Sequence, residues 1–421
     1  MLETIKKLFS RENRDLQKRI LFTLGVLFVF KLGTSIIVPG IDKDALGTGR
    51  LSFLQLMNMM GGGSMERFSI FSLGVLPYIN ASIIIQLLQM DIVPYLADLA
   101  KEGHTGRQKI NKITRVVGII LAFVQGYLLS FVYIEGGTPL QYMEFATVLT
   151  AGTAFLLWLG DQVTAKGVGN GVSLIIMAGI VSNLPSMFYT AWQGFVGTSM
   201  STFGILKFAL FVIIYFGIVL GVVYEQLTER RIPIQYANKS AGTMNGGQNY
   251  LPFKLNSAGV MPVIFASALL SIPSLIAQVS KKQGVIDFVN KWITYTSPTG
   301  FILYIILIIA FGYFYTFLEI KPKDMAEDLQ KSGGYIPGVR PGEETKKYIT
   351  KVLKSLTIVG SILLAFIAGL PIIFGKITGL PSSVTIGGTG LIIVVGVAIE
   401  TWKQVESSLT KRNYKKGRRR Y

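Results

Sequence analysis

Apolar residues are gathered into ten runs along this chain, and polar or charged segments separate one run from the next. The runs cover approximately residues 20–38, 72–92, 116–135, 147–161, 171–190, 205–224, 255–277, 300–318, 351–371 and 385–403. A helix of about twenty apolar residues is long enough to cross the hydrocarbon core of a bilayer. The pattern therefore predicts an all-α polytopic membrane protein with ten transmembrane helices.

One motif occurs twice: GVLPYINAS at residues 74–82 returns as GVMPVIFAS at residues 259–267, with six of nine positions identical. Gly and Pro are common in membrane helices, so two unrelated kinked helices are the alternative explanation. With the N-terminus inside, the second span runs inward and the seventh runs outward. We therefore expect an inverted repeat of two five-helix halves, residues 1–204 and 205–421, with the transport pathway between them. Pro77 and Pro262 each remove a backbone donor and are expected to loosen the two helices.

Charge supports this topology. Half of the residues are hydrophobic, only 15% are charged, and the net charge is +18. With both termini placed in the cytoplasm, 32 of the 41 Lys and Arg residues fall on the cytoplasmic side, including a basic tail at 404–421. This bias is the positive-inside signal of plasma-membrane proteins, and it suits an anionic lipid surface.

Three connecting segments are longer than a connection requires. The external segment 39–71 contains FLQLMNMMGGGSMERF, which is too short to span the membrane and too apolar for water. It is either an interfacial helix or a segment that folds back into the protein on its glycines. The cytoplasmic loops 225–254 and 319–350 are either solvated basic loops or docking surfaces, and the second contains a short helix and the turn-rich GGYIPGVRPGE.

Residues for bond chemistry are scarce. The chain has no Cys, which excludes disulfides and thiolate nucleophiles, and its one histidine, His104, lies in a polar loop. We predict no catalytic residue, no cofactor and no metal site. A charge at the centre of a membrane helix costs about 2.5–3.5 kcal/mol, so ion-coupled carriers keep such charges for function. Here Lys31 is the only clearly internal basic residue, and the acidic residues near the spans lie at their cytoplasmic ends: Asp91, Asp161, Glu225, Glu319 and Glu400.

Seven stretches, in one order over nearly the whole chain, carry a resemblance to a known family. They are PGID at 39–42, SIFSLGVLPYINASIIIQLL at 69–88, KEGHTGRQKI at 101–110, KGVGNGVSLIIMAGIV at 166–181, NSAGVMPVIFAS at 256–267, KSGGYIPGVRPGEET at 331–345 and GGTGLIIVV at 387–395. In these stretches the chain resembles the SecY family, the pore subunits of the general protein-secretion channel.

The resemblance implies a clamshell of two halves, an hourglass pore and a side opening to lipid between the second and seventh spans. It assigns the pore ring to Val75, Ile79, Val172, Ile176, Ile264 and Ile393. Val75 with Ile79, and Val172 with Ile176, are spaced i, i+4 and share a helix face. Taken singly, each of these residues is more simply explained by packing or lipid contact.

The resemblance also implies a plug at about 53–66, a lateral gate and cytoplasmic docking sites. The plug residues are Phe53, Leu54, Leu56, Met57, Met59, Met60, Gly61, Gly62 and Gly63. The gate residues are Pro77, Asn80, Gln86, Asn256 and Pro262, although interhelical hydrogen bonding is the simpler account of Gln86 and Asn256. Among the docking residues, Arg340 lies in the turn that the family uses to bind its motor ATPase. The others, Arg230, Arg231 and Lys239, lie in the second docking loop, which in the family also contacts ribosomal RNA.

The function implied is a passive protein-conducting channel in the plasma membrane of a bacterium. Its expected partners are SecE-like and SecG-like small membrane subunits, a SecA-like motor ATPase, the ribosome, signal peptides, unfolded polypeptides and anionic lipids. Two rival functions make different predictions. A small-solute carrier would show saturable uptake without an ATPase, and a membrane-embedded hydrolase would need a nucleophile that the sequence does not offer.

Overall fold

The computed structural model describes residues 13–39, 61–64, 68–90, 92–134, 136–197, 202–236, 249–280, 282–294, 297–379 and 382–417. Ten helices in these residues overlap the ten predicted runs one for one. They are α2 (Arg14–Gly33), α4 (Leu76–Leu88), α6 (His104–Tyr133), α7 (Pro139–Lys166), α8 (Gly171–Phe195), α9 (Thr202–Leu227), α10 (Met261–Ser280), α12 (Pro298–Glu319), α14 (Glu343–Thr378) and α15 (Ser382–Gly417). Six of them, α6, α7, α8, α9, α12 and α14, are long and apolar enough to cross a membrane, and α4 and α10 supply shorter apolar helices.

The start of each of several helices follows from its local sequence. At α7 the Thr138 side chain accepts from the Gln141 backbone while the Gln141 side chain accepts from the Thr138 backbone, so both ends of a capping box are present. At α8 the Asn170 side chain accepts from the backbone N–H groups of Val172 and Ser173. These caps satisfy donors that have no partner within the helix itself.

Several helices extend beyond their apolar runs at the end that carries the charged residues. α15 continues to Gly417, so most of the segment predicted as a basic tail is helical. Its Lys, Arg, Glu, Gln and Leu residues all favour helix, which explains why the helix does not stop where the apolar run stops. A helix of 36 residues is about 54 Å long, well beyond the roughly 30 Å of a hydrocarbon core.

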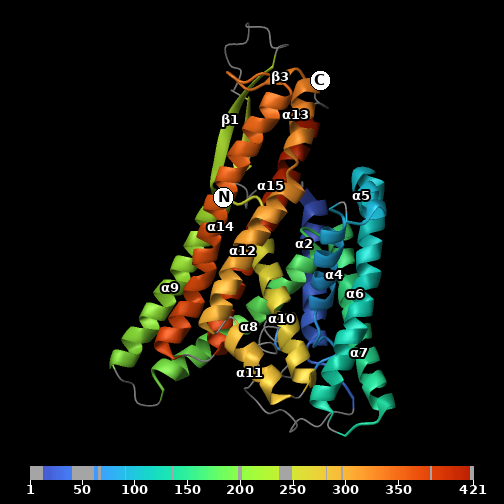
Figure 1. Cartoon of the computed structure of the whole chain (residues 1–421), viewed down its shortest axis with the longest axis vertical. Coiled ribbons are helices and arrows are strands. Elements are labelled where there is room, and N and C mark those ends of the chain that lie inside the picture. Colours follow the sequence, from blue (N-terminus) through green and yellow to red (C-terminus); the bar gives the residue numbers. More distant parts are fainter. Residues whose placement is uncertain are drawn as a thin grey trace.

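Smaller elements connect the long helices. They are α5 (Pro94–Lys101), α11 (Gln283–Trp292), α13 (Pro322–Lys331), β1 (Glu229–Tyr236), β2 (Asn249–Lys254) and β3 (Gly334–Tyr335). The short helix expected in the loop 319–350 is α13. The strands form an antiparallel sheet in the order β2-β1-β3, which no sequence pattern predicted. Figure 1 shows β1, β3, α13 and α5 at one end of the molecule and α11 at the other.

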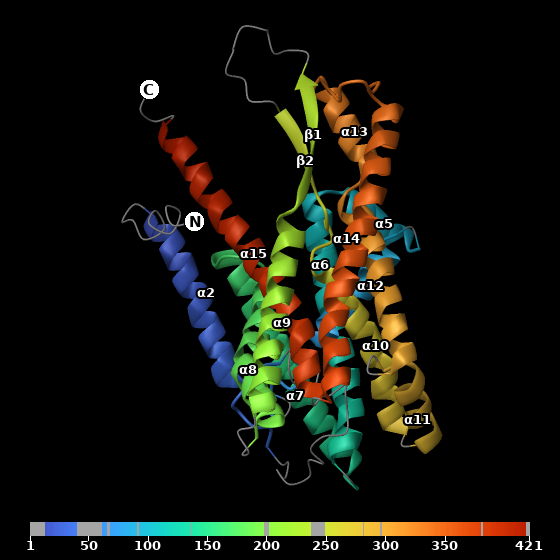
Figure 2. The same cartoon turned by 90° about the vertical axis from the view of Figure 1, so that its left-hand side faces the viewer.

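The long helices form two groups that meet along two seams. α2 to α8 make the first group and α9 to α15 the second; at one seam α8 contacts α9 and α15, and at the other α10 contacts α4 and α6. One hydrophobic core, with residues from both groups, lies between the seams. Figure 2, turned by 90°, shows α9 and α15 beside α8, with α10 on the far side of α14. The arrangement is a ten-helix clamshell.

The two copies of the repeated motif have the same backbone conformation. Gly74 and Gly259 both have positive φ angles, 56° and 62°, a conformation that costs glycine little because it has no Cβ. Two residues later the helices begin, α4 at Leu76 and α10 at Met261. α4 runs toward the end that carries α5, whereas α10 runs toward the end that carries α11 (Figure 1). The two motifs are therefore inverted copies.

The expectation that Pro77 and Pro262 loosen the two helices is wrong. Each proline is the second residue of its helix, where a backbone N–H would have no helical partner, so the proline costs nothing and starts the helix. Among the described residues, the prolines inside helices are Pro185, Pro273 and Pro371.

Candidate functional site

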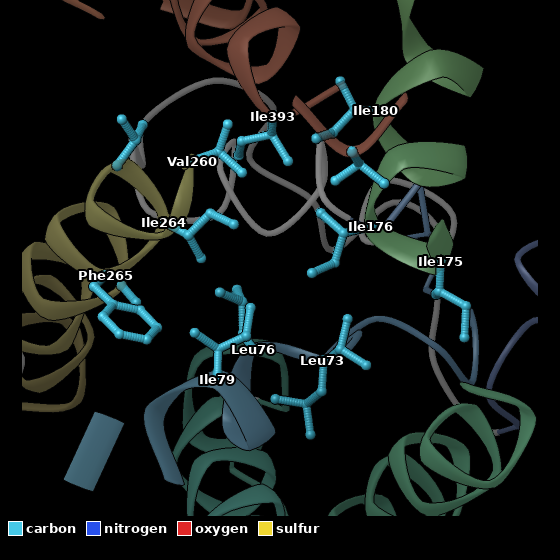
Figure 3. Close-up of a cluster of buried hydrophobic side chains, with 14 of the residues drawn as sticks. Leu73, Leu76, Ile79, Ile175, Ile176, Ile180, Val260, Ile264, Phe265 and Ile393 are labelled. Atoms are coloured by element: carbon cyan, nitrogen blue, oxygen red, sulfur yellow. The ribbon is translucent and has the colours of Figure 1, made fainter. Parts of the chain in front are cut away.

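The predicted ring residues lie in one place although they come from four helices. Ile79, Ile176, Ile264 and Ile393 belong to α4, α8, α10 and α15, and Figure 3 shows their side chains pointing toward a common centre. Each is at most 6% exposed. Val75, the residue before α4, is buried in the same cluster, and Val172 is partly buried against it.

The same cluster holds residues that sequence reasoning did not select. Leu76, Ile180 and Val260 lie beside the four isoleucines in Figure 3. Ile180 follows Ile176 by one helical turn, so extending the i, i+4 rule would have found it. Val260 directly precedes α10, and no spacing signal points to it.

Two of the gate residues on α4, the buried Asn80 and the half-buried Gln86, each have a buried oxygen without a described hydrogen-bond partner. Asn80 is 6% exposed, and its Oδ1 has no hydrogen-bond partner among the described residues. Gln86 donates from Nε2 to Ser82 Oγ at 3.1 Å, while its Oε1 likewise has no described partner. Because α10 is the helix of the second group that contacts α4, these amides lie on a helix at the seam where the groups meet. Their gate role stays a prediction.

Asn256 is bound inside its own group of helices. It is 7% exposed, and its Nδ2 donates to Glu225 Oε1 at 2.9 Å and to the Gly259 carbonyl at 2.8 Å. Glu225, near the end of α9, is completely buried. This placement favours a structural hydrogen bond, here between α9 and the turn before α10, over direct gate contact. The sequence did not reveal that Glu225 is the partner of Asn256.

The glycine end of the predicted plug is buried within the protein. Gly61, Gly62, Gly63 and Ser64 are all buried; the Gly62 carbonyl accepts from Lys31 Nζ of α2 at 3.4 Å. A Cβ added at Gly62 would lie 3.2 Å from Gly179 Cα of α8. Residues 61–64 therefore fit the folded-back alternative rather than the interfacial helix. The other plug residues, Phe53, Leu54, Leu56, Met57, Met59 and Met60, lie outside the described residues, as does most of PGID at 39–42.

The two long cytoplasmic loops meet in the small sheet. β1 pairs with β2 in one loop and with β3 in the other, and Tyr335 Oη donates to Gln235 Oε1 at 2.9 Å. Ile232 and Ile234 of β1 pack with Phe253, Ile336 and α14 residues in a second hydrophobic cluster. The sheet therefore places both predicted docking loops on one rigid support.

The predicted docking residues are exposed on this support. Arg230 and Arg231 lie on β1 and Arg340 lies in the turn after β3, while Lys239 falls outside the described residues. Arg231 donates from Nε to Glu229 Oε1 at 2.8 Å, and this hydrogen bond raises the pKa of the Arg231 guanidinium. The sheet thus presents permanent positive charge beyond the helix ends.

Comparison with solved structures identifies the class of fold. "The structure of a protein conducting channel" matches with a TM-score of 0.67 at 20% identity, covering 93% of this chain and 92% of the other. "Sec61 in the Canine ribosome-channel complex from the endoplasmic reticulum" matches with a TM-score of 0.65, 20% identity and the same coverage. The fold is that of the protein-conducting channels.

Sequence comparison gives the family. The SecY family model matches residues 69–402. "Protein translocase subunit SecY" of Staphylococcus epidermidis is 47% identical over 431 residues, and that of Staphylococcus aureus is 45% identical over 427 residues. Each alignment covers 99% of both chains. The chain belongs to the SecY family, and the resemblance inferred from its seven motifs is confirmed.

Proposed function

We propose that this chain is the pore-forming subunit of a protein-translocating channel in the plasma membrane of a bacterium. It passes unfolded secretory polypeptides across the membrane and releases signal or transmembrane helices sideways into lipid. The observation that carries this proposal is the ring: four isoleucines from four helices, two in each helix group, point toward one centre between the seams (Figure 3).

The ring seals the pore by dewetting. Branched apolar side chains around a constriction exclude water and ions, yet they can move aside when a polypeptide enters. We assign this role to Val75, Ile79, Val172, Ile176, Ile264 and Ile393. Such a pore performs no bond chemistry, so the chain is not an enzyme and the energy for transport comes from a partner.

The two halves, predicted as residues 1–204 and 205–421, divide at the start of α9, Thr202. They move about the seam between α8 and the helices α9 and α15. The opposite seam, where α10 faces α4 and α6, is the lateral gate, and Asn80 and Gln86 supply polar groups there. Pro77 and Pro262 fix where the two gate helices begin. The segment at about 53–66 is the plug, and its buried glycine end supports this assignment.

The cytoplasmic sheet is the docking surface for the energy source. Arg340 engages a SecA-like motor ATPase, and Arg230, Arg231 and Lys239 engage the motor or the ribosome. SecE-like and SecG-like subunits complete the complex, and the basic cytoplasmic face contacts anionic lipids. The support for docking here is that both loops share one sheet and one core.

Reconstitution tests this function. The chain, purified with its small membrane subunits, is placed in liposomes with a SecA-like ATPase, ATP and a radiolabelled preprotein. We expect the preprotein to become protected from added protease only when ATP and the motor are both present. Saturable uptake of a small solute without the motor, together with no protected preprotein, would instead establish the carrier.

A further inference from the structure

β1 and β2 form a hairpin in the cytoplasmic loop 225–254, the docking hairpin, and Glu225 and Asn256 are hydrogen-bonded to each other at its base. β1 begins four residues after Glu225, and β2 ends two residues before Asn256. Between them, the Leu255 backbone N–H donates to the Thr228 carbonyl at 2.9 Å, and Glu229 pairs with Lys254. The hydrogen bond from Asn256 Nδ2 to Glu225 Oε1 thus ties the two legs of the hairpin together where they join the helices.

The same amide fixes the start of the gate helix. An Asn side chain has two N–H donors, and here one binds Glu225 and the other binds the carbonyl of Gly259. Gly259 is the positive-φ residue two positions before α10. Asn256 therefore connects the end of α9, the base of the hairpin and the first turn of α10.

The inverted copy of the motif is held in a different way. The carbonyl of Gly74, the counterpart of Gly259, accepts from Thr153 Oγ1 of α7 at 3.2 Å, and Thr153 is completely buried. That hydrogen bond lies wholly within the first helix group. Only the second copy is anchored through a side chain that also closes the docking hairpin.

Burial makes the hydrogen bond between Glu225 and Asn256 costly to break. Glu225 has no exposed surface, and its second oxygen, Oε2, has no hydrogen-bond partner among the described residues. Breaking the hydrogen bond from Asn256 would leave both buried oxygens of Glu225 without a described partner. An unsatisfied buried polar group costs free energy, so this hydrogen bond resists being broken. The hairpin base cannot shift without either breaking this hydrogen bond or carrying the start of α10 along.

We propose that Glu225 is a positioning residue that, through Asn256, couples displacement of the docking hairpin to movement of the gate helix α10. The inference rests on the proposed function, because it assumes that a partner docks on the hairpin and that α10 forms the gate. It adds the residue pair that transmits docking to the gate.

The test measures how the gate responds to docking. A cysteine pair across α4 and α10, in this chain without native cysteine, reports gate closure as the fraction oxidised to a disulfide. The probe is purified bacterial ribosomes carrying a short signal-bearing nascent chain. Couplings between sites are typically at least about fivefold, so docking should lower the cross-linking rate by about that factor when Glu225 is present.

Glu225→Leu removes the acceptor but fills the site, whereas Glu225→Gln keeps an oxygen that accepts from Asn256. We expect Glu225→Leu to bind ribosomes with unchanged affinity in co-sedimentation but to lose most of the cross-linking response. Glu225→Gln should keep the response. Thr153→Val, which removes the corresponding hydrogen bond in the first copy, should keep it too.

A double variant separates closure of the hairpin from attachment of α10, and it places no apolar residue at position 225. In Glu225→Gln with Asn256→Asp the new amide donates to the Asp carboxylate, so the hydrogen bond at the base of the hairpin is kept. Asp has no N–H group to donate to the Gly259 carbonyl, so the contact with the start of α10 is lost. We expect this variant to bind ribosomes with unchanged affinity but to lose most of the cross-linking response.

A normal gate response in Glu225→Leu would overturn the coupling role, and so would loss of the response in Glu225→Gln. A normal response in the double variant would overturn it as well, because the contact with the Gly259 carbonyl is the step that reaches α10. Failure of the proposed function looks different: the unsubstituted chain would then bind no ribosomes, or bind them without any change in cross-linking.

Discussion

The side chains of the ring have branched apolar ends and offer no hydrogen bond to water or to an ion. Ile264 is 5% exposed and Ile393 is 5% exposed, so in this state the constriction is packed rather than open. The chemistry of these few side chains sets the resistance to wetting. A polypeptide can displace them, because they come from four different helices.

Replacing Ile264 or Ile393 with Asn should weaken the seal. Burying an amide without a partner costs about 1–3 kcal/mol, so the closed state loses stability relative to the wetted one. Secretion of a reporter with a defective signal sequence should rise several-fold in cells that contain either variant at normal abundance.

Ile264→Leu is the matched control, because it keeps an apolar side chain of equal volume and should leave secretion of the reporter unchanged. If neither Asn variant raises secretion, Ile264 and Ile393 do not form the seal.

Glu225 shows what could not be predicted at the residue scale. Its position near a span end was visible, but its partner lies 31 residues away on a different element. No periodicity connects a residue at the end of α9 with one before α10. The repeated motif, in contrast, predicted the equivalence of Gly74 and Gly259 because identical residues impose the same backbone conformation at both sites.

At the scale of elements, the long helices were predictable and the strands were not. Each long helix coincides with an apolar run of its own in the sequence, so its signal is local. β1 buries only Ile232 and Ile234, and β3 has two residues; their pairing depends on the packing of two loops that are distant in sequence. The start of α4 was misjudged because Pro77 was expected inside the helix rather than at its first turn.

Arg340→Glu should stop motor-driven export. Arg340 is exposed in the turn after β3 and its carbonyl accepts from Thr345 Oγ1 at 2.9 Å, a contact that does not depend on the side chain. The turn should therefore fold normally while the reversed charge opposes docking. Preprotein translocation into inverted membrane vesicles should fall by at least about tenfold, a loss of roughly 1.4 kcal/mol in docking.

Lys331→Glu is the control for Arg340→Glu, since Lys331 is an exposed basic residue on α13 beside the same sheet. It should keep near-normal export. Equal losses in both variants would point to a general charge effect, and full export by Arg340→Glu would remove Arg340 from the docking site.

Deleting residues 54–62 should make the resting channel conduct ions. The segment leads into the buried Ser64, whose carbonyl accepts from Ser72 Oγ at 3.0 Å shortly before α4, and we expect its removal to open the space on that side of the ring. Planar-bilayer recordings should show resting conductance in the deletion variant and almost none in the parent chain. Equally low resting conductance in the deletion variant and the parent chain would favour an interfacial helix for residues 53–60.

At the scale of the whole molecule, function depends on two helix groups that touch along two seams. At the first seam α9 follows α8 directly in the chain and α15 packs against α8, whereas at the second seam α10 reaches α4 and α6 only through space. A protein-conducting channel with a side exit requires the second seam to part while the first holds.

The most direct test of this account is a reversible disulfide between α4 and α10, across the second seam. One cysteine replaces Asn80 or Ile83 on α4, and a second is scanned over residues 265–272 of α10; only pairs with Cα atoms roughly 4.4–6.8 Å apart should oxidise efficiently.

The control pair replaces Tyr78 and Gly118, within the first group, where a Cβ added at Gly118 lies 3.6 Å from Tyr78 Cβ. Preprotein translocation into vesicles is measured after oxidation and again after reduction. The account predicts that α4–α10 disulfides abolish translocation, that reduction restores it, and that the control disulfide has little effect; normal translocation through the oxidised α4–α10 channel would contradict it.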